Sequence, residues 1–422
     1  MRKVVIVGAV RSPIGAYTGS LRDVPAYELG ALVLNEALRR ADLPPDMVDD
    51  VIMGQSYQSG ESVNIARMAL LAANWPMHVP GITLDRRCCS GLDAVCFGAM
   101  KIQSDWADIV VAGGVESMSR AEFYVPGEFV KWGMGGFRDP KWGLMPKGHG
   151  ALPMWGIPFF DRIQRARVMS QPIERFGELN SMMTWAEAAA SQEGISREAA
   201  DRWAKRSHEK AIAALDTGKF REELVAVTIP QKKGAPVVID ADETPRRDTT
   251  LERLGRLQTV YPDGICTAGN SSTENDGAAA VVLMTAEKAN QLGITPLATI
   301  VSFAVAAADP TLTYPAVPAA VDKALAKAGL AVQDMDLIEI QEAFAAQVLA
   351  DAKLMGLDEA TCEAKVNVNG SGISLGHPIA ATGTMRLVTL LYEMRRRRAR
   401  YGLETICGGG GQGIAAVVEG VK

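Results

Sequence analysis

The sequence has 422 residues, of which 48% are hydrophobic and 22% charged, a composition typical of globular domains. Its length exceeds a single ordinary core and predicts two or three domains or one large duplicated unit. The net charge of −5 argues against nucleic acid or an anionic membrane as a partner.

The N-terminal stretch MRKVVIVGAVRSP predicts a buried strand rather than a signal peptide, because its apolar run is short and ends at Arg11 and Pro13. No run of about 18 uncharged apolar residues exists, so no transmembrane segment is expected. The six cysteines form no C-x-x-C pair and no zinc-like cluster. We therefore expect no metal site, reduced thiols and a cytoplasmic location.

The chain resembles itself at an offset of roughly 290 residues, which indicates an internal duplication. The first strand, VVIVGAV (4–10), matches ATIVSFAV (298–305). The amphipathic helix, loop and strand predicted over residues 25–54 match those predicted over 314–340.

The duplication continues in two later pairs of segments. DRRCCSGLDAVCFGAMKI (85–102) aligns with NGSGISLGHPIAATGTMRLV (369–388), each a Gly/Ser-rich turn that enters a helix. The strand-like DIVVAGGVESMS (108–119) aligns with ETICGGGGQGIAAVV (404–418). Alternating strands and helices predict an α/β fold with sheets covered by helices.

A different segment, at about residues 120–250, separates the two halves. It holds five of the seven tryptophans, is rich in Gly and Pro from Pro126 to Pro158, and then becomes helical. The strand predicted over 271–285 returns to complete the first half. We therefore predict an N-terminal half from residues 1–120 plus 250–289, an inserted covering domain at 121–249, and a C-terminal half at 290–422.

Chemistry is predicted where the duplicated turns meet. Cys88 and Cys89 begin a helix in the first half, the GHP around His377 lies at the matching turn of the second, and Cys407 ends a strand. A helix N-terminus favours a thiolate, and Arg86 and Arg87 are expected to act in the same direction. A neutral histidine can accept the thiol proton, which is the arrangement of a cysteine nucleophile in acyl transfer.

The sequence resembles the thiolase family over nearly the whole chain, because it contains five motifs of that family in the order in which the family has them. They are DRRCCSG, NVNGSGISLGHPIAATG, CGGGGQG, QEAF and AGNSSTENDGA. The resemblance implies the thiolase fold, in which two duplicated halves form an αβαβα arrangement of five layers with an inserted loop domain over the active site.

The resemblance also implies roles for individual residues. Cys88 is the nucleophile that carries the acyl group, His377 accepts its proton, and Cys407 is the acid/base for the carbon next to the second thioester. Backbone N–H groups of Cys88 and Gly409 are expected to bind oxyanions. Cys89 is interpreted as a small helix-start residue.

The family further implies substrates and contacts. Coenzyme A and acyl-CoA are expected as substrates, with no tightly bound cofactor. The expected coenzyme A contacts are Ser272, Phe344, Met182 and Arg246.

The sequence departs from the family pattern at several positions. Gln341 replaces the Asn of NEAF, whose amide holds a water in an oxyanion hole, so Gln341 either keeps that water or donates directly. SMMTWAE (181–187) replaces H-M-G-x-T-A-E, and residues 131–162 are long and aromatic. This insertion is interpreted as a small hydrophobic core of the inserted domain, as part of a wider acyl pocket, or as a docking surface.

We therefore expect a thiolase that cleaves 3-oxoacyl-CoA with coenzyme A through acyl-Cys88 in the β-oxidation direction. The alternatives are a biosynthetic acetoacetyl-CoA-forming thiolase, a non-thiolase condensing enzyme of the same fold, and an inactive scaffold subunit. The resemblance implies a homodimer or homotetramer and allows association with a hydratase/dehydrogenase subunit. The acyl chain is not predicted.

Overall fold

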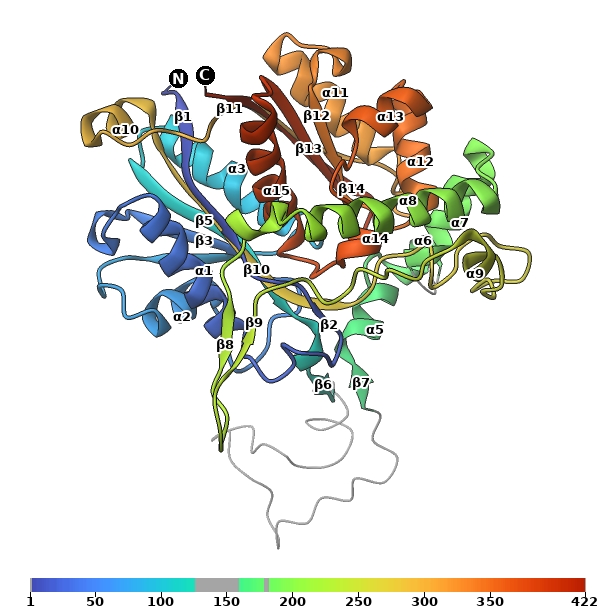
Figure 1. Ribbon diagram of the computed structural model, residues 1–422, viewed down its shortest axis with the longest axis horizontal. Coiled ribbons are helices and arrows are strands. Elements are labelled where there is room, and N and C mark those ends of the chain that lie inside the picture. Colours follow the sequence, from blue (N-terminus) through green and yellow to red (C-terminus); the bar gives the residue numbers. More distant parts are fainter. Residues whose placement is uncertain (1, 126–158, 178–181, 422) are drawn as a thin grey trace, which may run out of the picture.

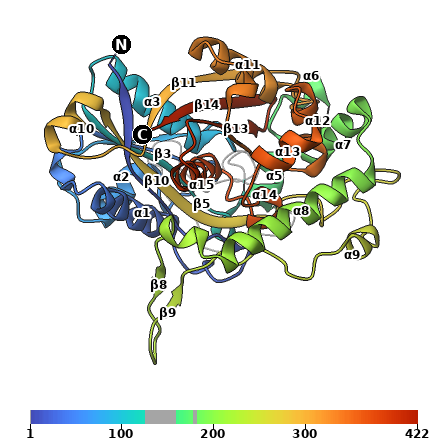
Figure 2. The ribbon, with the colours of Figure 1, turned by 45° about the horizontal axis from the view of Figure 1, so that its top comes forward.

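The computed structural model describes residues 2–125, 159–177 and 182–421 (Figure 1). Its strands and helices form five alternating layers, with a pair of helices between two groups of strands and further helices outside each group (Figures 1 and 2). The expected α/β architecture of two related halves is therefore confirmed. Most of residues 131–162, the aromatic insertion, lie outside the described residues.

The strands of the first half run in the spatial order β1-β10-β5-β3-β4, with β2 paired to β10. β3 is parallel to both β4 and β5, whereas β10 is antiparallel to β1 and β5. Their bounds are β1 (Val4–Arg11), β2 (Gly15–Ala16), β3 (Asp50–Gly54), β4 (Gly81–Leu84), β5 (Ile109–Ser117) and β10 (Asn275–Thr285).

The strands of the second half repeat this pattern in the order β11-β14-β13-β12. β12 and β13 are parallel, and β14 is antiparallel to β13 and β11. An isolated bridge from Ile338 to Val366 takes the place of the fifth strand. The bounds are β11 (Ala298–Ala307), β12 (Leu337–Ile340), β13 (Tyr401–Gly408) and β14 (Gln412–Gly420).

The two halves join where β1 and β11 pair antiparallel through two residues each. α3 and α15 occupy the matching positions of the two repeats, pack against each other, and each contacts strands of both halves. The helices of the halves are α1 (Ala26–Arg40), α2 (Ile65–Ala72), α3 (Ser90–Gln103), α10 (Ala286–Leu292), α11 (Ala316–Ala328), α12 (Ala345–Leu354), α13 (Glu359–Lys365), α14 (Gly372–Leu375) and α15 (Thr382–Arg397). Short 3₁₀ turns are η1 (Pro45–Met47), η2 (Met118–Arg120) and η4 (Val332–Asp334).

Three apolar cores hold the layers together. The central core packs α3 and α15 between the two groups of strands. A second core packs α1 and α2 on the first half, and a third packs α11 and α12 on the second. Because β5 and β10 are buried along their whole length, they read as near-continuous apolar runs instead of alternating strands.

The inserted segment lies over one end of the two halves (Figure 1). The predicted helical stretch forms two helices, α7 and α8, on either side of Gly194. The described elements are β6 (Phe123–Tyr124), β7 (Phe160–Asp161), α5 (Arg162–Val168), α6 (Ile173–Phe176), α7 (Met182–Glu193), α8 (Arg197–Asp216), η3 (Lys219–Glu222), β8 (Val227–Ile229), β9 (Val237–Ile239) and, after them, α9 (Leu251–Gly255). The predicted domain boundaries at residues 120, 249 and 289 stay a prediction.

No helix among the described residues is long and apolar enough to cross a membrane.

Candidate active site

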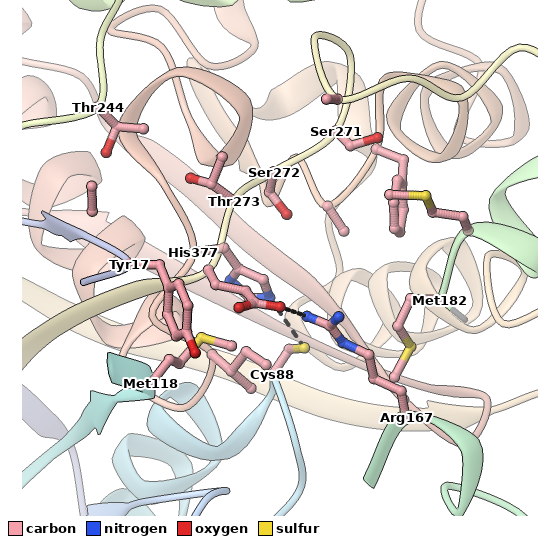
Figure 3. A pocket seen from close by; sticks show the side chains of 18 of the residues that line it. Tyr17, Cys88, Met118, Arg167, Met182, Thr244, Ser271, Ser272, Thr273 and His377 are labelled. Atoms are coloured by element: carbon pink, nitrogen blue, oxygen red, sulfur yellow. Dashed lines mark hydrogen bonds and ion pairs between the residues drawn. The ribbon is translucent and has the colours of Figure 1, made fainter. Parts of the chain in front are cut away.

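A cavity of about 620 Å³ opens where the turns of both halves meet the inserted segment (Figure 3). Among the residues that line it are eight of the nine side chains or backbone groups expected from the sequence. They are Cys88, His377, Cys407, Gly409, Ser272, Phe344, Met182 and Arg246. Gln341 is not among the lining residues.

Cys88 is presented by a tight turn that precedes α3. Arg87, the residue before it, has φ of 53°, a left-handed conformation that costs a residue with a Cβ some free energy. Local hydrogen bonds stabilise the turn: the Arg87 N–H donates to Asp85 Oδ1 at 2.8 Å, and the Ser90 hydroxyl donates to the Arg87 carbonyl at 2.6 Å. The turn therefore positions Cys88 at the N-terminal end of α3.

His377 is presented by the matching turn of the second half. Gly376 before it has φ of 95°, and a Cβ there would lie 2.6 Å from the Asn275 side chain, so only glycine fits. Asn275 fixes the turn by accepting from the His377 N–H at 2.8 Å. Both reactive residues thus follow a left-handed residue in related turns.

Cys88 and His377 are in direct contact. His377 Nε2 lies 3.2 Å from Cys88 Sγ, and Nδ1 lies 2.7 Å from Thr382 Oγ1. The Thr382 hydroxyl donates its only proton to the Pro378 carbonyl at 3.0 Å, so Thr382 accepts from Nδ1–H. Nε2 is then the unprotonated nitrogen, ready to accept the thiol proton.

The resting pair is neutral. Burial raises the pKa of Cys88 to about 12, although the charge of Arg87 and the N–H groups of Gly409 and Cys88 itself lower it. Burial lowers the pKa of His377 to about 3, and Arg386 and Arg167 lower it further. The expected preference for a thiolate at Cys88 is therefore not found, because desolvation outweighs the nearby donors and charge. Arg86 pairs with Asp93 instead.

The neutral pair predicts how Cys88 alkylation depends on pH. Because the thiol pKa is raised, the thiolate fraction of the free protein should rise about tenfold per pH unit from pH 7 to pH 10. The rate of iodoacetamide modification, followed by mass spectrometry of the Cys88 peptide, should rise in parallel. A plateau that begins below pH 8 would mean that the thiolate already exists at rest.

Thr382 is predicted to orient the His377 ring. Thr382→Val removes the acceptor of Nδ1–H and should lower kcat by roughly tenfold, about the worth of one hydrogen bond. Thr382→Ser should restore most of the rate. Thr384→Val is the matched control, since the Thr384 hydroxyl is buried on the same helix without a partner among the described residues. Equal losses in both valine variants, or an unchanged rate in Thr382→Val, would contradict this role.

Cys407 is the second-last residue of β13, beside the glycine run of residues 408–411. It is buried, and burial raises its pKa well above the ordinary value, with a further rise from charge on Cys88. Gly409 directs its backbone N–H to the Cys88 sulfur. A Cβ at Gly409 would lie 2.8 Å from Met182 Cε, so the glycine allows the inserted helix α7 to approach.

An apolar wall surrounds Cys407. Trp185 and Phe344 stack edge to face with ring centroids 5.3 Å apart, and the Trp185 indole N–H lies 3.3 Å from Met182 Sδ. Cys266 packs in the same cluster. The departures Met183 and Trp185 from the family pattern therefore form packing beside the second thiol.

The polar end of the cavity is lined by Ser272 and Arg246, among others. Ser272 is held by a backbone hydrogen bond from its N–H to the Ala343 carbonyl at 2.9 Å, and Arg246 donates its backbone N–H to His208 Nδ1 at 3.1 Å. A second, smaller pocket shares Arg246 and Ser271 with the main cavity, so the polar end continues along the surface.

The Gln341 amide is buried beside the cavity. Neither its oxygen nor its nitrogen has a hydrogen-bond partner among the described residues. A Cβ on Gly372 would lie 2.3 Å from the Gln341 Nε2. An unpartnered buried amide of this kind requires a water or ligand partner.

Several supporting residues were not singled out from the sequence, although Asn275 and Thr382 lie in the quoted motifs. Glu116 accepts from the N–H groups of Ser56, Tyr57 and Ala380. It thereby links the loop after β3 to the histidine turn, and burial raises its pKa to about 7. The signal in the sequence was a glutamate, Glu116, near the end of an otherwise apolar strand.

No cluster of three or more potential metal ligands occurs among the described residues. The six cysteines are free thiols.

Comparisons with known proteins agree with this site. The family descriptions "Thiolase, N-terminal domain" and "Thiolase, C-terminal domain" match residues 4–287 and 294–420. An acetyl-CoA acetyltransferase of Pseudomonas aeruginosa is 43% identical over 421 residues, with 98% of each chain covered.

Two solved structures are also similar. The Bacillus anthracis acetyl-CoA acetyltransferase has a TM-score of 0.88 and 40% identity, and the human mitochondrial 3-ketoacyl-CoA thiolase has 0.88 and 34%. Each comparison covers 100% of this chain and 99% of the other.

The fold and the cysteine–histidine site, together with these relatives, define an acyltransferase enzyme. The chain belongs to the thiolase family, and the expected thiolase fold is confirmed.

Proposed function

We propose that this thiolase cleaves 3-oxoacyl-CoA with coenzyme A to acyl-CoA and acetyl-CoA, reversibly, through an acyl-Cys88 intermediate. The observation that carries the proposal is the 3.2 Å contact of Cys88 Sγ with His377 Nε2 in a cavity that Cys407 and Gly409 also line. Coenzyme A and its esters are the substrates, and the reaction requires no tightly bound cofactor.

In the first half-reaction, His377 accepts the Cys88 proton as the sulfur attacks the 3-oxo carbon. The bond between carbons 2 and 3 breaks, and Cys407 protonates the acetyl-CoA enolate that leaves. The rise in sulfur charge is offset by N–H donors of the Cys88 and Gly409 backbone.

In the second half-reaction, the Cys407 thiolate accepts the coenzyme A proton. The new thiolate attacks acyl-Cys88, and the leaving Cys88 sulfur recovers its proton from His377. Protons and electron pairs balance over the cycle, and both thiols and the imidazole return to their resting forms.

Gln341 is proposed to contribute through a water, since its buried amide has no hydrogen-bond partner in the described part of the chain and does not line the cavity. Ser272, Phe344, Met182 and Arg246 are proposed to contact coenzyme A, with Arg246 at the polar end. Their common position along one cavity supports this assignment.

The degradative direction is the preferred proposal. Beyond the dyad the cavity extends past Tyr57, Met118 and Ile379, which leaves room for an acyl group larger than acetyl. The insertion that also suggested this direction lies largely outside the described residues. A homodimer or homotetramer, a cytoplasmic location, a role in β-oxidation and association with a hydratase/dehydrogenase subunit are parts of the same proposal.

The second candidate is biosynthetic acetoacetyl-CoA formation, favoured by the names of relatives called acetyl-CoA acetyltransferase. A non-thiolase condensing enzyme of this fold is less favoured, because Cys407 lines the cavity with Cys88. Both alternatives use Cys88 as the nucleophile, so only the products distinguish them from the proposed function.

Product analysis distinguishes these functions. The protein is incubated with 3-oxoacyl-CoAs of increasing chain length plus coenzyme A, and separately with acetyl-CoA alone. Chromatography with mass spectrometry should find acetyl-CoA and the shortened acyl-CoA, with kcat/KM higher for at least one longer chain than for acetoacetyl-CoA. Activity confined to acetoacetyl-CoA would favour the biosynthetic candidate, and no cleavage of any chain would overturn the thiolase proposal.

A further inference from the structure

An ion pair stands in the cavity beside the reactive dyad. Arg167 on α5 and Glu274, just before β10, both line the cavity with Cys88 and His377, and Arg167 Nη2 lies 2.5 Å from Glu274 Oε1 (Figure 3). Their side chains are only 23% and 25% exposed. None of the catalytic steps described above uses either side chain.

The surroundings of this pair are apolar. Tyr57, Met118 and Ile379 belong to one small apolar cluster, and all three line the cavity. A plain hydrocarbon chain here would strip the remaining water from the ion pair and provide nothing in exchange, which is costly. An unsubstituted acyl group therefore fits the apolar lining but matches the ion pair less well than an acyl group with a polar end.

Arg167 has unused hydrogen-bonding capacity. A guanidinium carries five N–H donors, of which one bonds Glu274 and another makes a long 3.4 Å contact with Gln164 Oε1. The described residues supply no further side-chain or backbone acceptor. A planar fork of this kind matches a carboxylate.

A second cation adds to the positive field. Arg87 Nη2 donates to the Ala166 carbonyl at 3.3 Å, one residue from Arg167. Glu274 is paired with Arg167, and Glu116 accepts from three backbone N–H groups. Glu243 also lines the cavity, and it accepts from the N–H groups of Ala16 and Ser20 and from the Ser20 hydroxyl. The carboxylates near Arg167 thus already have partners, whereas its guanidinium keeps donors free for a ligand.

We propose that the preferred acyl group carries a carboxylate, which Arg167 binds while Glu274 holds the guanidinium in place; this inference rests on the proposed thiolase function. The substrate class is then the mono-coenzyme A ester of a 3-oxodicarboxylic acid. Arg167 acts as a specificity residue and not as a group in the bond-breaking steps.

The test compares matched substrates that differ only at the chain end. They are 3-oxohexanedioyl-CoA against 3-oxohexanoyl-CoA, and 3-oxooctanedioyl-CoA against 3-oxooctanoyl-CoA. In at least one pair the wild-type enzyme should prefer the carboxylate in kcat/KM by about 10- to 100-fold, as expected for a charge-assisted hydrogen bond.

Variants assign that preference to Arg167. Arg167→Met should abolish the ratio between the paired substrates, with most of the change in KM, and Arg167→Lys should restore part of it. Glu274→Gln should raise the ratio, because it removes the competing anion and keeps the shape. Arg165→Met is the control, since Arg165 lies on the same helix but packs on Phe160 and does not line the cavity.

The outcomes separate this inference from the proposed function. Cleavage of the methyl-ended substrates without a carboxylate preference would overturn the inference alone. A loss of equal size on both substrates in Arg167→Met would also overturn it. If the wild-type enzyme cleaves no 3-oxoacyl-CoA, both the proposed function and this inference are wrong.

Discussion

Replacing Cys88 by alanine should lower kcat for thiolysis by about 10⁵- to 10⁶-fold, the effect of deleting a covalent nucleophile. The physical reason is that the Cys88 sulfur, 3.2 Å from His377 Nε2, is the atom that receives the acyl group, and alanine has no nucleophile to replace it. The variant should fold normally, because the lost atom is a single sulfur at the cavity wall. Steady-state thiolysis and thermal melting measure the two effects.

The neighbouring cysteine provides the matched control. Cys89 is fully buried, its sulfur lies 3.4 Å from the Ile406 carbonyl, and it is not a cavity-lining residue. Cys89→Ala should keep kcat within a few-fold and cost some stability through a small cavity. If Cys89→Ala loses activity as severely as Cys88→Ala, the assignment of the nucleophile to Cys88 is wrong.

The second large effect is expected at Cys407. Cys407→Ala should lower thiolysis by about 10²- to 10⁴-fold, the contribution of a positioned acid/base. Exchange of the acetyl-CoA methyl protons with solvent deuterium, followed by NMR, should fall in parallel. Acylation of Cys88 by an acyl-CoA needs no carbon acid chemistry, and water can protonate the coenzyme A thiolate that leaves, so this half-reaction should fall much less than proton exchange.

Cys266→Ala controls for packing near Cys407. Cys266 lies in the same apolar cluster, but it is not a cavity-lining residue. We expect normal proton exchange in that variant. Equal losses in acylation and in proton exchange in Cys407→Ala, or retention of proton exchange, would contradict the assigned role.

The fold could be predicted because the duplication repeats its sequence signals. The strand and helix predicted from residues 25–54 and 314–340 correspond to α1 with β3 and to α11 with β12. Hydrophobic periodicity predicts the strands and helices within each half. The match between the two halves predicts that they share one fold. The same duplication placed Cys88 and His377 at equivalent turns, which the structure brings into contact.

Other features depended on three-dimensional packing. The thiol pKa followed from burial, which no local spacing reveals, so the predicted thiolate was not found. The Arg167–Glu274 pair joins side chains 107 positions apart, and neither residue is distinctive in its own segment. Gln341 was predicted as an oxyanion group from its motif, but its amide lies close to Gly372 and is not part of the cavity lining.

The most direct test of the account is to locate the acyl group itself. The wild-type protein is mixed with a cleavable 3-oxoacyl-CoA without coenzyme A, quenched in acid and digested with trypsin, which cuts after Arg87 and Lys101. Fragmentation of the resulting peptide separates Cys88, Cys89 and Cys96. The account predicts an acyl mass on Cys88 that disappears when coenzyme A is added. An acyl group on another residue, or turnover with no acylated Cys88, would contradict it.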